Sequence, residues 1–309
     1  MFESLDLDQF PPRLQDNPGH VPTIRLEMPA FKAAAKKLIQ SKVLEASQAQ
    51  AEELVFQGEF ARLLVEEESC IDWQGLIHSL PRGLLSFAAR LTSNTLASPD
   101  NLARWRKIVD PRCQLCDHSP CTLFHLLSNC PKALEQGRYD YRHDSVLSFL
   151  YSVVRRMKGD KVEVYCDLDG GRVNGTTIPP DIVLTTSKPD LVIVDRSATP
   201  PRLDLIELTI PWDSGTEDAR IRKQARYARL VDDCNEAGYN CINTPLEIGA
   251  RGLITQRNRS TLTWLCSRAK ERKVKRFIST CSKLALLGSY SVWVARRSKD
   301  WTAGRLLQP

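Results

Sequence analysis

Residues 188–210 read KPDLVIVDRSATPPRLDLIELTI, and they carry most of the information about the fold. Two apolar runs rich in β-branched residues lie on either side of the Pro200-Pro201 pair, a pattern that predicts a β-hairpin. Asp190 opens the first run, and Glu207 lies inside the second. A buried carboxylate is costly unless it is paired or bound to a metal, so two carboxylates on neighbouring strands indicate a divalent-metal site.

Hydrophobic periodicity on both sides of the hairpin predicts a mixed α/β core with a central sheet. In the segment 142–157, five apolar residues fall on one buried helical stripe: Val146, Leu147, Leu150, Val153 and Val154. The predicted order is helix 142–157, a strand at 161–168, the two hairpin strands, helix 216–237, a strand at 239–248 and a further helix at 258–273.

The composition is ordinary for a soluble protein, with 42% hydrophobic and 26% charged residues, and 309 residues suffice for one large or two modest domains. The net charge of +6 is only mildly basic, but the basic residues are clustered. One cluster spans 268–276, and another lies on one predicted helix and comprises Arg220, Arg222, Lys223, Arg226 and Arg229. Such clusters suit a phosphate backbone, although a solvated basic face explains either cluster equally well on its own.

The opening residues, 1–8, are acidic and lack the apolar core of a signal peptide, and no apolar run approaches the ~20 residues of a membrane span. We therefore expect an intracellular protein, located in the nucleus, with no membrane partner and no small-molecule cofactor. Cysteines stay reduced in that compartment, so the ten cysteines of this chain direct attention to metal ligands.

Four potential ligands have the two-plus-two layout of a structural zinc site: Cys113-x2-Cys116-x8-His125-x4-Cys130. A Cys-x2-Cys turn offers two thiolates to one metal, and a short helix can bring a histidine and a cysteine to its other side. His118 and Cys121 lie inside the loop and are rival ligands, and His125 is the least secure of the four. Four protein ligands would close the site, which predicts a structural role.

In this order the motifs resemble the C-terminal region of non-LTR (LINE-type) retrotransposons that carry a restriction-like endonuclease. That region follows the reverse transcriptase and contains a Cys-Cys-His-Cys zinc knuckle, an Arg-His-Asp box and a Lys-Pro-Asp endonuclease core. The matching stretches beside the knuckle are NLARW at 101–105, GRYDYRHDSVL at 137–147, KPD at 188–190, ELTIP at 207–211 and EIGARG at 247–252.

The resemblance covers roughly residues 72–265 and implies a PD-(D/E)xK restriction-endonuclease-like core in the order αβββαβ, after a small zinc knuckle and an α-helical N-terminal region. One departure concerns the polymerase, whose paired catalytic aspartates are absent, because Val231-Asp232-Asp233 lies in a predicted helix. We therefore expect a truncated element or a stand-alone gene derived from one.

The expected organisation has five parts. They are a disordered, proline-rich leader at 1–30, an α-helical region at 31–110, the zinc knuckle at 111–135, the restriction-like endonuclease domain at 136–268 and a basic C-terminal tail at 269–309.

The lysine of the usual PD-(D/E)xK signature is missing from its place. It would be the second residue after Glu207 on the same face of the strand, where Thr209 cannot supply a cation. A stripe of the predicted helix 216–237 that faces the core or the site comprises Lys223, Tyr227, Leu230 and Cys234. The resemblance likewise implies that the lysine has moved to this helix, which makes Lys223 the candidate.

The expected catalytic residues are Asp190 and Glu207, which would hold Mg²⁺, and Lys223, which would offset the charge that develops on the phosphate. His143 and Asp144 join them from the box. Alternatively, His143 is a satisfied core histidine, and Asp144 is an acid that interacts with the helix macrodipole. The residues expected to contact nucleic acid are Lys188, Arg142, Arg222 and Arg226.

Together these features favour a Mg²⁺-dependent DNA endonuclease that nicks its target by attack of a metal-activated water on a phosphodiester. The alternative is a catalytically silent, zinc-containing nucleic-acid-binding protein of retrotransposon origin, and a third reading is a decayed fragment that folds only in part. The expected partner is DNA, with RNA as the other option, and the expected metals are structural Zn²⁺ and catalytic Mg²⁺. Intact Asp190, Glu207 and Lys223 favour the endonuclease, because a silent module has no need of them.

Overall fold

The computed structural model describes residues 28–159, 162–266 and 269–302. Packing divides the chain after Gln50 into two units. The described part of the first unit belongs to helix α1 (Met28–Glu53), whose side chains are mostly exposed between residues 32 and 50. The expected leader at 1–30 lies outside the described residues, apart from the last three, which begin α1.

Four short helices open the second unit: α2 (Glu59–Glu66), α3 (Trp73–His78), α4 (Arg82–Thr92) and α5 (Pro99–Arg104). The side chains of Asp72 and Ser98 cap α3 and α5 by accepting a backbone N–H from the residue three positions on. Helix α4 buries one apolar face and packs against α10 (Glu271–Val294). Its buried residues share one hydrophobic cluster with residues of the sheet.

Helix α7 (Arg138–Lys158) contains the predicted helix 142–157 and begins four residues earlier, after Gly137. Gly137 has a positive φ of 68°, a conformation that glycine adopts at little cost. The predicted apolar stripe from Val146 to Val154 is buried. The prediction of this helix and of its inward face is therefore confirmed.

The sheet consists of β1 (Glu163–Cys166), β2 (Leu191–Asp195), β3 (Arg202–Thr209) and β4 (Asn240–Glu247), in that spatial order. β2 pairs with both β1 and β3 in antiparallel register, which confirms the predicted hairpin. β3 and β4 are parallel, and α8 (Thr216–Glu236) supplies the crossover that parallel neighbours need. The protein is thus a mixed α/β protein with a central sheet, as predicted, and the sheet contains both antiparallel and parallel pairs.

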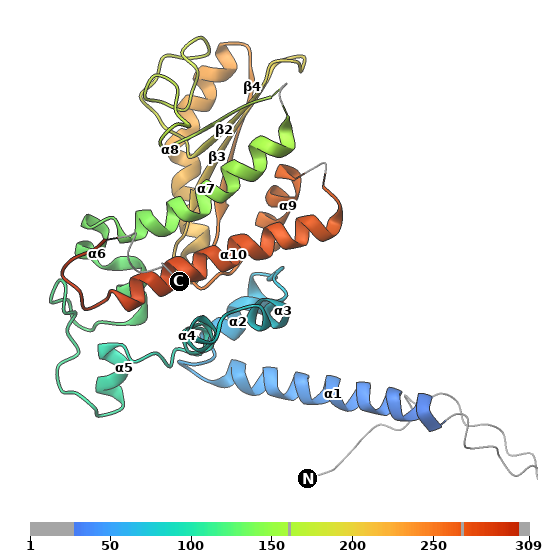
Figure 1. Ribbon diagram of the computed structural model, residues 1–309, viewed down its shortest axis with the longest axis vertical. Helices are drawn as coiled ribbons and strands as arrows, with labels where there is room; N and C mark the ends of the chain where they lie inside the picture. The colour runs from blue at the N-terminus through green and yellow to red at the C-terminus, as the bar shows by residue number, and fades with distance from the viewer. Residues whose placement is uncertain (1–27, 160–161, 267–268, 303–309) are drawn as a thin grey trace, which may run out of the picture. The chain divides into compact units, whose positions relative to one another are not determined.

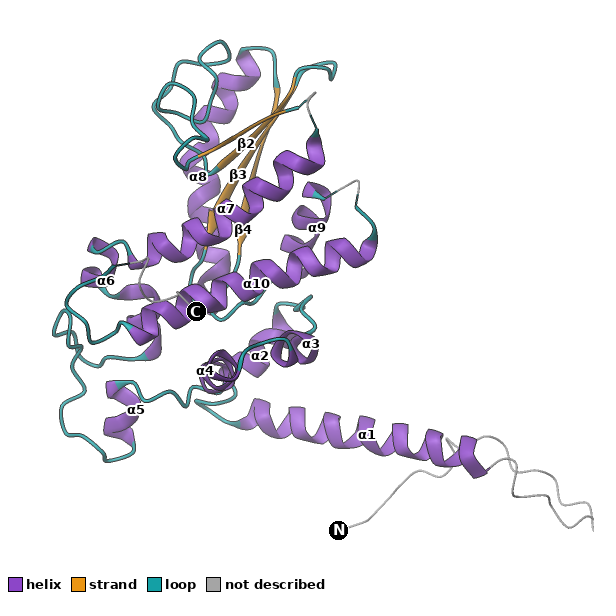
Figure 2. Cartoon of the chain, in the orientation of Figure 1, coloured by secondary structure: helices purple, strands orange, loops and turns teal. Residues whose placement is uncertain are grey.

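The sheet separates two layers of helices, because successive side chains of a strand point to opposite faces. On one face, Leu191 and Leu208 belong to the buried cluster that includes the α7 stripe. On the other face, Val192 and Leu205 pack in a smaller cluster with Tyr227 of α8. Figure 1 shows α7 and α8 on either side of the strands, and Figure 2 shows the same layers by secondary structure. The carboxyl end of β3 therefore lies between the two long helices.

The structure corrects the expected basic tail at 269–309. Residues Glu271–Val294 form helix α10, which packs along α7 and buries an apolar face that includes Cys281 and Leu286. The basic residues that suggested a tail, such as Lys273 and Arg276, are exposed on the other face of this helix, while position 268 lies outside the described residues. The predicted helix 258–273 is also shorter than expected, since α9 spans Gln256–Leu265.

Among the described residues, no helix combines the length and the apolarity needed to cross a membrane.

Candidate functional site

Four side chains bring their ligand atoms within 4.8 Å of one another: Cys113, Cys116, His125 and Cys130. Cys130 Sγ lies 4.0 Å from Cys113 Sγ and 3.6 Å from Cys116 Sγ, and Cys116 Sγ lies 3.3 Å from His125 Nε2. Two sulfur atoms bound to one tetrahedral zinc through ~2.3 Å bonds stand ~3.8 Å apart. The predicted ligand set is therefore assembled with a spacing that could hold Zn²⁺.

Local backbone structure positions this Cys₃His cluster. The N–H of Asp117 donates to the carbonyl of Cys113 at 2.9 Å and closes the turn between the first two cysteines. A short helical turn, η2 (His125–Asn129), carries His125, and Cys130 follows it. Tyr139 of α7 accepts a hydrogen bond from the N–H of Cys130 at 3.0 Å, so the cluster is fastened to the long helix.

The two rival ligands are not part of the cluster. His118 stacks on His125 with 4.4 Å between the ring centroids, and Cys121 is completely buried nearby. The folded geometry, rather than the spacing, thus separates the four ligands from their rivals.

Burial raises the pKa of Cys130 to about 12, so its thiol must lose a proton when a metal binds.

A second site lies at the carboxyl end of β3, where two buried acids meet. Asp190 is 8% exposed and Glu207 is 2% exposed. Oδ2 of Asp190 accepts the N–H of Leu208 at 2.8 Å, and Oε2 of Glu207 accepts the N–H of Asp190 at 3.2 Å. Burial and the charge of Asp190 raise the pKa of Glu207, while Lys223 opposes that rise. We refer to Asp190 and Glu207 as the acid pair.

Lys223 reaches the acid pair from α8. Its Nζ forms a close ion pair with Oε1 of Glu207, and its side chain is 19% exposed. The stripe that suggested this position also places Tyr227 and Leu230 in the core between α8 and the sheet. Thr209, where the usual signature would have lysine, keeps a buried Oγ1 with no hydrogen-bond partner among the described residues.

His143 approaches the acid pair from α7. Its Nε2 lies 3.3 Å from Oδ2 of Asp190, and its Nδ1 lies 3.0 Å from Oδ1 of Asp144. Burial disfavours the charged imidazole, but the hydrogen bonds and charges of the two aspartates outweigh burial and raise the pKa of His143 to about 10. Asp144 is half exposed and contacts His143, so it is linked to Asp190 through that histidine.

Both acids open onto one cavity of about 400 Å³, which has a basic rim. Three side chains expected from the sequence to contact nucleic acid line this cavity and are exposed: Lys188, Arg222 and Arg226. Arg220, which lies on α8 with Arg222 and Arg226, instead pairs with Glu217. The rim therefore offers three cationic side chains beside the acid pair.

Arg142 also lines this cavity, but unlike the three exposed cations it is largely buried. Its side chain is 2% exposed and donates hydrogen bonds to the carbonyls of Leu127 at 2.8 Å and Ile210 at 3.1 Å, and to Ser289 Oγ at 3.0 Å. Gly288 of α10 permits this packing, because a Cβ there would stand 2.4 Å from Arg142 Cγ. The guanidinium of Arg142 is thus held mainly by the protein interior, and only a small part of this residue is exposed to the cavity.

Sequence reasoning did not single out Asp167, which also lines the cavity. Its N–H donates to the carbonyl of Asp190 at 2.9 Å, and its carboxylate pairs with Arg172. The available signal was its position directly after the strand Glu163–Cys166, whose last residue pairs with Leu191. That pairing depends on the register of the sheet, which the sequence pattern does not fix.

Comparison with protein-family models gives no match for this chain, and comparison with curated proteins gives none either. Function therefore has to be inferred from the geometry of the two sites.

Proposed function

We propose that the chain is a Mg²⁺-dependent DNA endonuclease with a PD-(D/E)xK type of core, derived from a non-LTR retrotransposon. The proposal rests on the meeting of Asp190, Glu207 and Lys223. Asp190 directly precedes β2, Glu207 lies in β3 and Lys223 lies in α8. Acid, acid and lysine follow one another as in that signature, with the lysine moved to the next helix. The elements around them run α7, β1, β2, β3, α8 and β4, which agrees with this type of core.

The donors of the acid pair suit a hard divalent cation. Mg²⁺ usually takes one or two carboxylates from a protein and keeps several waters, and Asp190 and Glu207 supply two carboxylates at an open cavity. When bound there, Mg²⁺ would polarise a scissile phosphate and lower the pKa of a bound water. Each acid also accepts a backbone N–H, which keeps its carboxylate in place when a cationic side chain moves away.

The cationic side chains around the acid pair have separate roles in this proposal. Lys223 offsets negative charge that develops on the phosphate during cleavage. His143 directs Nε2 at Asp190 from the opposite helix layer and Nδ1 at Asp144, so it is placed to orient the carboxylate of Asp190. Lys188, Arg222 and Arg226 would hold the flanking phosphates.

The Cys₃His cluster is proposed to bind a structural Zn²⁺. Four protein ligands leave no open position for substrate or water. The contact between Cys130 and Tyr139 would then fix the ligand segment against α7.

A catalytically silent nucleic-acid-binding protein is the second candidate. One observation favours it: each member of the acid pair already has a basic partner, since Lys223 pairs with Glu207 and His143 faces Asp190. A metal has to compete with both partners. The basic rim would bind nucleic acid in either case.

A nicking assay on supercoiled plasmid separates the two candidates. The full chain should convert plasmid to the open circle when Mg²⁺ is added and not when it is omitted. Asp190→Asn and Glu207→Gln should abolish nicking, whereas Glu135→Gln, which alters an exposed pair with Lys132, should not. Plasmid binding without Mg²⁺-dependent nicking would support the silent protein, and nicking by Glu207→Gln at the wild-type rate would contradict the proposed chemistry.

A further inference from the structure

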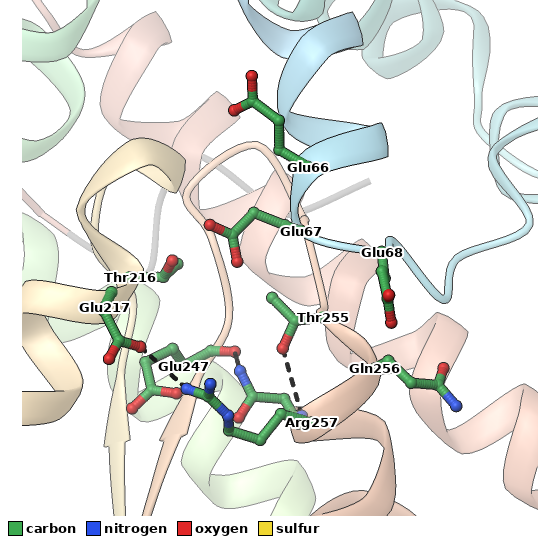
Figure 3. Close-up of a pocket in the computed structure, with 10 residues that line it drawn as sticks. Glu66, Glu67, Glu68, Thr216, Glu217, Glu247, Thr255, Gln256 and Arg257 are labelled. Atoms are coloured by element: carbon green, nitrogen blue, oxygen red, sulfur yellow. Dashed lines mark hydrogen bonds and ion pairs between the residues drawn. The ribbon is translucent and has the colours of Figure 1, made fainter.

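A separate pocket of about 200 Å³ lies among the end of α2, the start of α8, the end of β4 and the start of α9. Figure 3 shows the side chains that line it. Five glutamates and a single arginine are among these residues, and none of them lines the cavity of the acid pair. The pocket is therefore strongly acidic and independent of the proposed endonuclease site.

Two buried acceptors in this pocket lack a donor. Glu247 is 3% exposed and Asn258 is 2% exposed. Oε1 of Glu247 and Oδ1 of Asn258 have no hydrogen-bond partner among the described residues. The other polar atoms of Asn258 are engaged, since its Nδ2 donates to the carbonyl of Glu247 at 2.7 Å and its N–H donates to Thr255 Oγ1 at 3.3 Å. Buried acceptors are rarely left without a partner, so these two indicate a ligand that donates hydrogen bonds.

The neighbouring arginines do not supply that donor, because Arg220 and Arg257 both pair with Glu217. NH1 of Arg257 lies 2.9 Å from Oε2 of Glu217. Arg257 is 65% exposed at the edge of the pocket. Burial raises the pKa of Glu247, whereas Asn258 and the charges of Arg220 and Arg257 act in the opposite direction. A cation inside the pocket would favour the ionised form of Glu247.

We propose that this pocket binds a guanidinium cation, which donates to Oε1 of Glu247 and Oδ1 of Asn258. A guanidinium group presents several N–H donors in a planar fork, which suits acceptors on two different side chains. A dehydrated metal ion fits less well. In the described part of the chain, the close group of at least three His, Cys, Asp or Glu ligand atoms is the Cys₃His cluster, and the glutamates of this pocket form no such group.

The guanidinium can belong to a free small molecule or to an arginine side chain of a polypeptide, and calorimetric titration distinguishes these sources. Agmatine represents the free small molecule, and N-acetylarginine amide represents the peptide-borne group. Binding of the first alone assigns a small-molecule ligand, and binding of the second assigns an arginine side chain. Saturable binding of either supports the proposal. Binding of neither, or binding of Mg²⁺ or Ca²⁺ in their place, would overturn it.

Two variants connect the binding to the pocket. Glu247→Gln removes the buried charge at nearly constant size and should weaken binding about tenfold or more, because hydrogen bonds to a charged group are the stronger kind. Glu236→Gln, which alters an exposed glutamate at the end of α8, should leave binding unchanged. Thermal denaturation of Glu247→Gln checks that the variant is folded. Equal affinity of folded Glu247→Gln and wild type would refute the assignment.

Discussion

The backbone N–H of Asp190 donates to Oε2 of Glu207 at 3.2 Å, so the main chain of one acid holds the carboxylate of the other. A reciprocal bond runs from the N–H of Leu208, next to Glu207, to Oδ2 of Asp190 at 2.8 Å. These bonds satisfy backbone donors at the edge of the hairpin, where the ladder of the sheet ends. Because the donors are main-chain groups, replacing Lys223 or His143 leaves both carboxylates anchored.

Replacement of Lys223 should separate catalysis from binding. Lys223→Met removes the cation beside Glu207 and is expected to slow nicking by ~10²–10³-fold, the usual effect of losing one group that stabilises developing charge. It also leaves a buried carboxylate without its partner, which should cost about 1–3 kcal/mol of stability. Adding Glu207→Gln should restore stability but not nicking. Chemical denaturation and the plasmid assay measure the two effects, and a Lys223→Met protein that nicks normally would contradict the assignment.

Removal of the Cys₃His cluster should destabilise the whole protein. Elemental analysis of the purified chain is expected to give about one zinc per molecule, and Cys113→Ser should reduce both the zinc content and Tm, since structural zinc contributes folding free energy. Cys281→Ser is the control, because Cys281 is buried in α10 and outside the cluster. A stable wild-type protein that contains no zinc would exclude the proposed structural role.

Arg222 and Arg226 should contribute to DNA affinity through phosphate contacts. Arg222→Ala with Arg226→Ala is expected to reduce the slope of log K against log salt by about one for each lost contact. Arg229→Ala provides a matched control, because Arg229 is exposed on the same helix but does not line the cavity. Fluorescence anisotropy at several salt concentrations gives the slopes, and equal slopes for all variants would remove the basic rim from the binding site.

The free energy of unfolding should depend on pH because the environment of Glu247 raises the pKa of its carboxyl group. Its pKa is raised above 4.5 in the folded chain, so folding disfavours the ionised form. The carboxyl group therefore lowers stability above its folded pKa and has no such effect below 4.5. Glu247→Gln should raise Tm near neutral pH by on the order of 2–4 °C, and the gain should vanish under acidic conditions. A gain that persists at low pH would point to a cause other than this charge.

Local patterns were sufficient to predict several of these features. The stripe of α7, the hairpin and the position of Lys223 each follow from the periodicity of one or two elements, and the spacing of the cysteines restricts their geometry. His143 was ambiguous, because helical position alone does not distinguish a core histidine from one that faces Asp190.

Features that depend on several distant elements could not be predicted in this way. Arg142 is buried because Gly288, more than a hundred residues later, leaves space for its side chain. The apolar face of α10 is hard to recognise among its basic residues, because it is buried only when the helix packs against α7. The unpaired acceptor of Glu247 likewise results from the packing of four elements around one pocket.

The parallel pairing of β3 with β4 also bears on the order in which the chain folds. A short turn joins β2 to β3, whereas β4 reaches β3 only after the whole of α8 has been bridged. Closing the longer segment costs more conformational entropy, so we expect the hairpin to form first. Asp190 and Glu207 would then be neighbours before α8 delivers Lys223. Early in folding the two acids repel each other, and docking of the crossover helix relieves that repulsion.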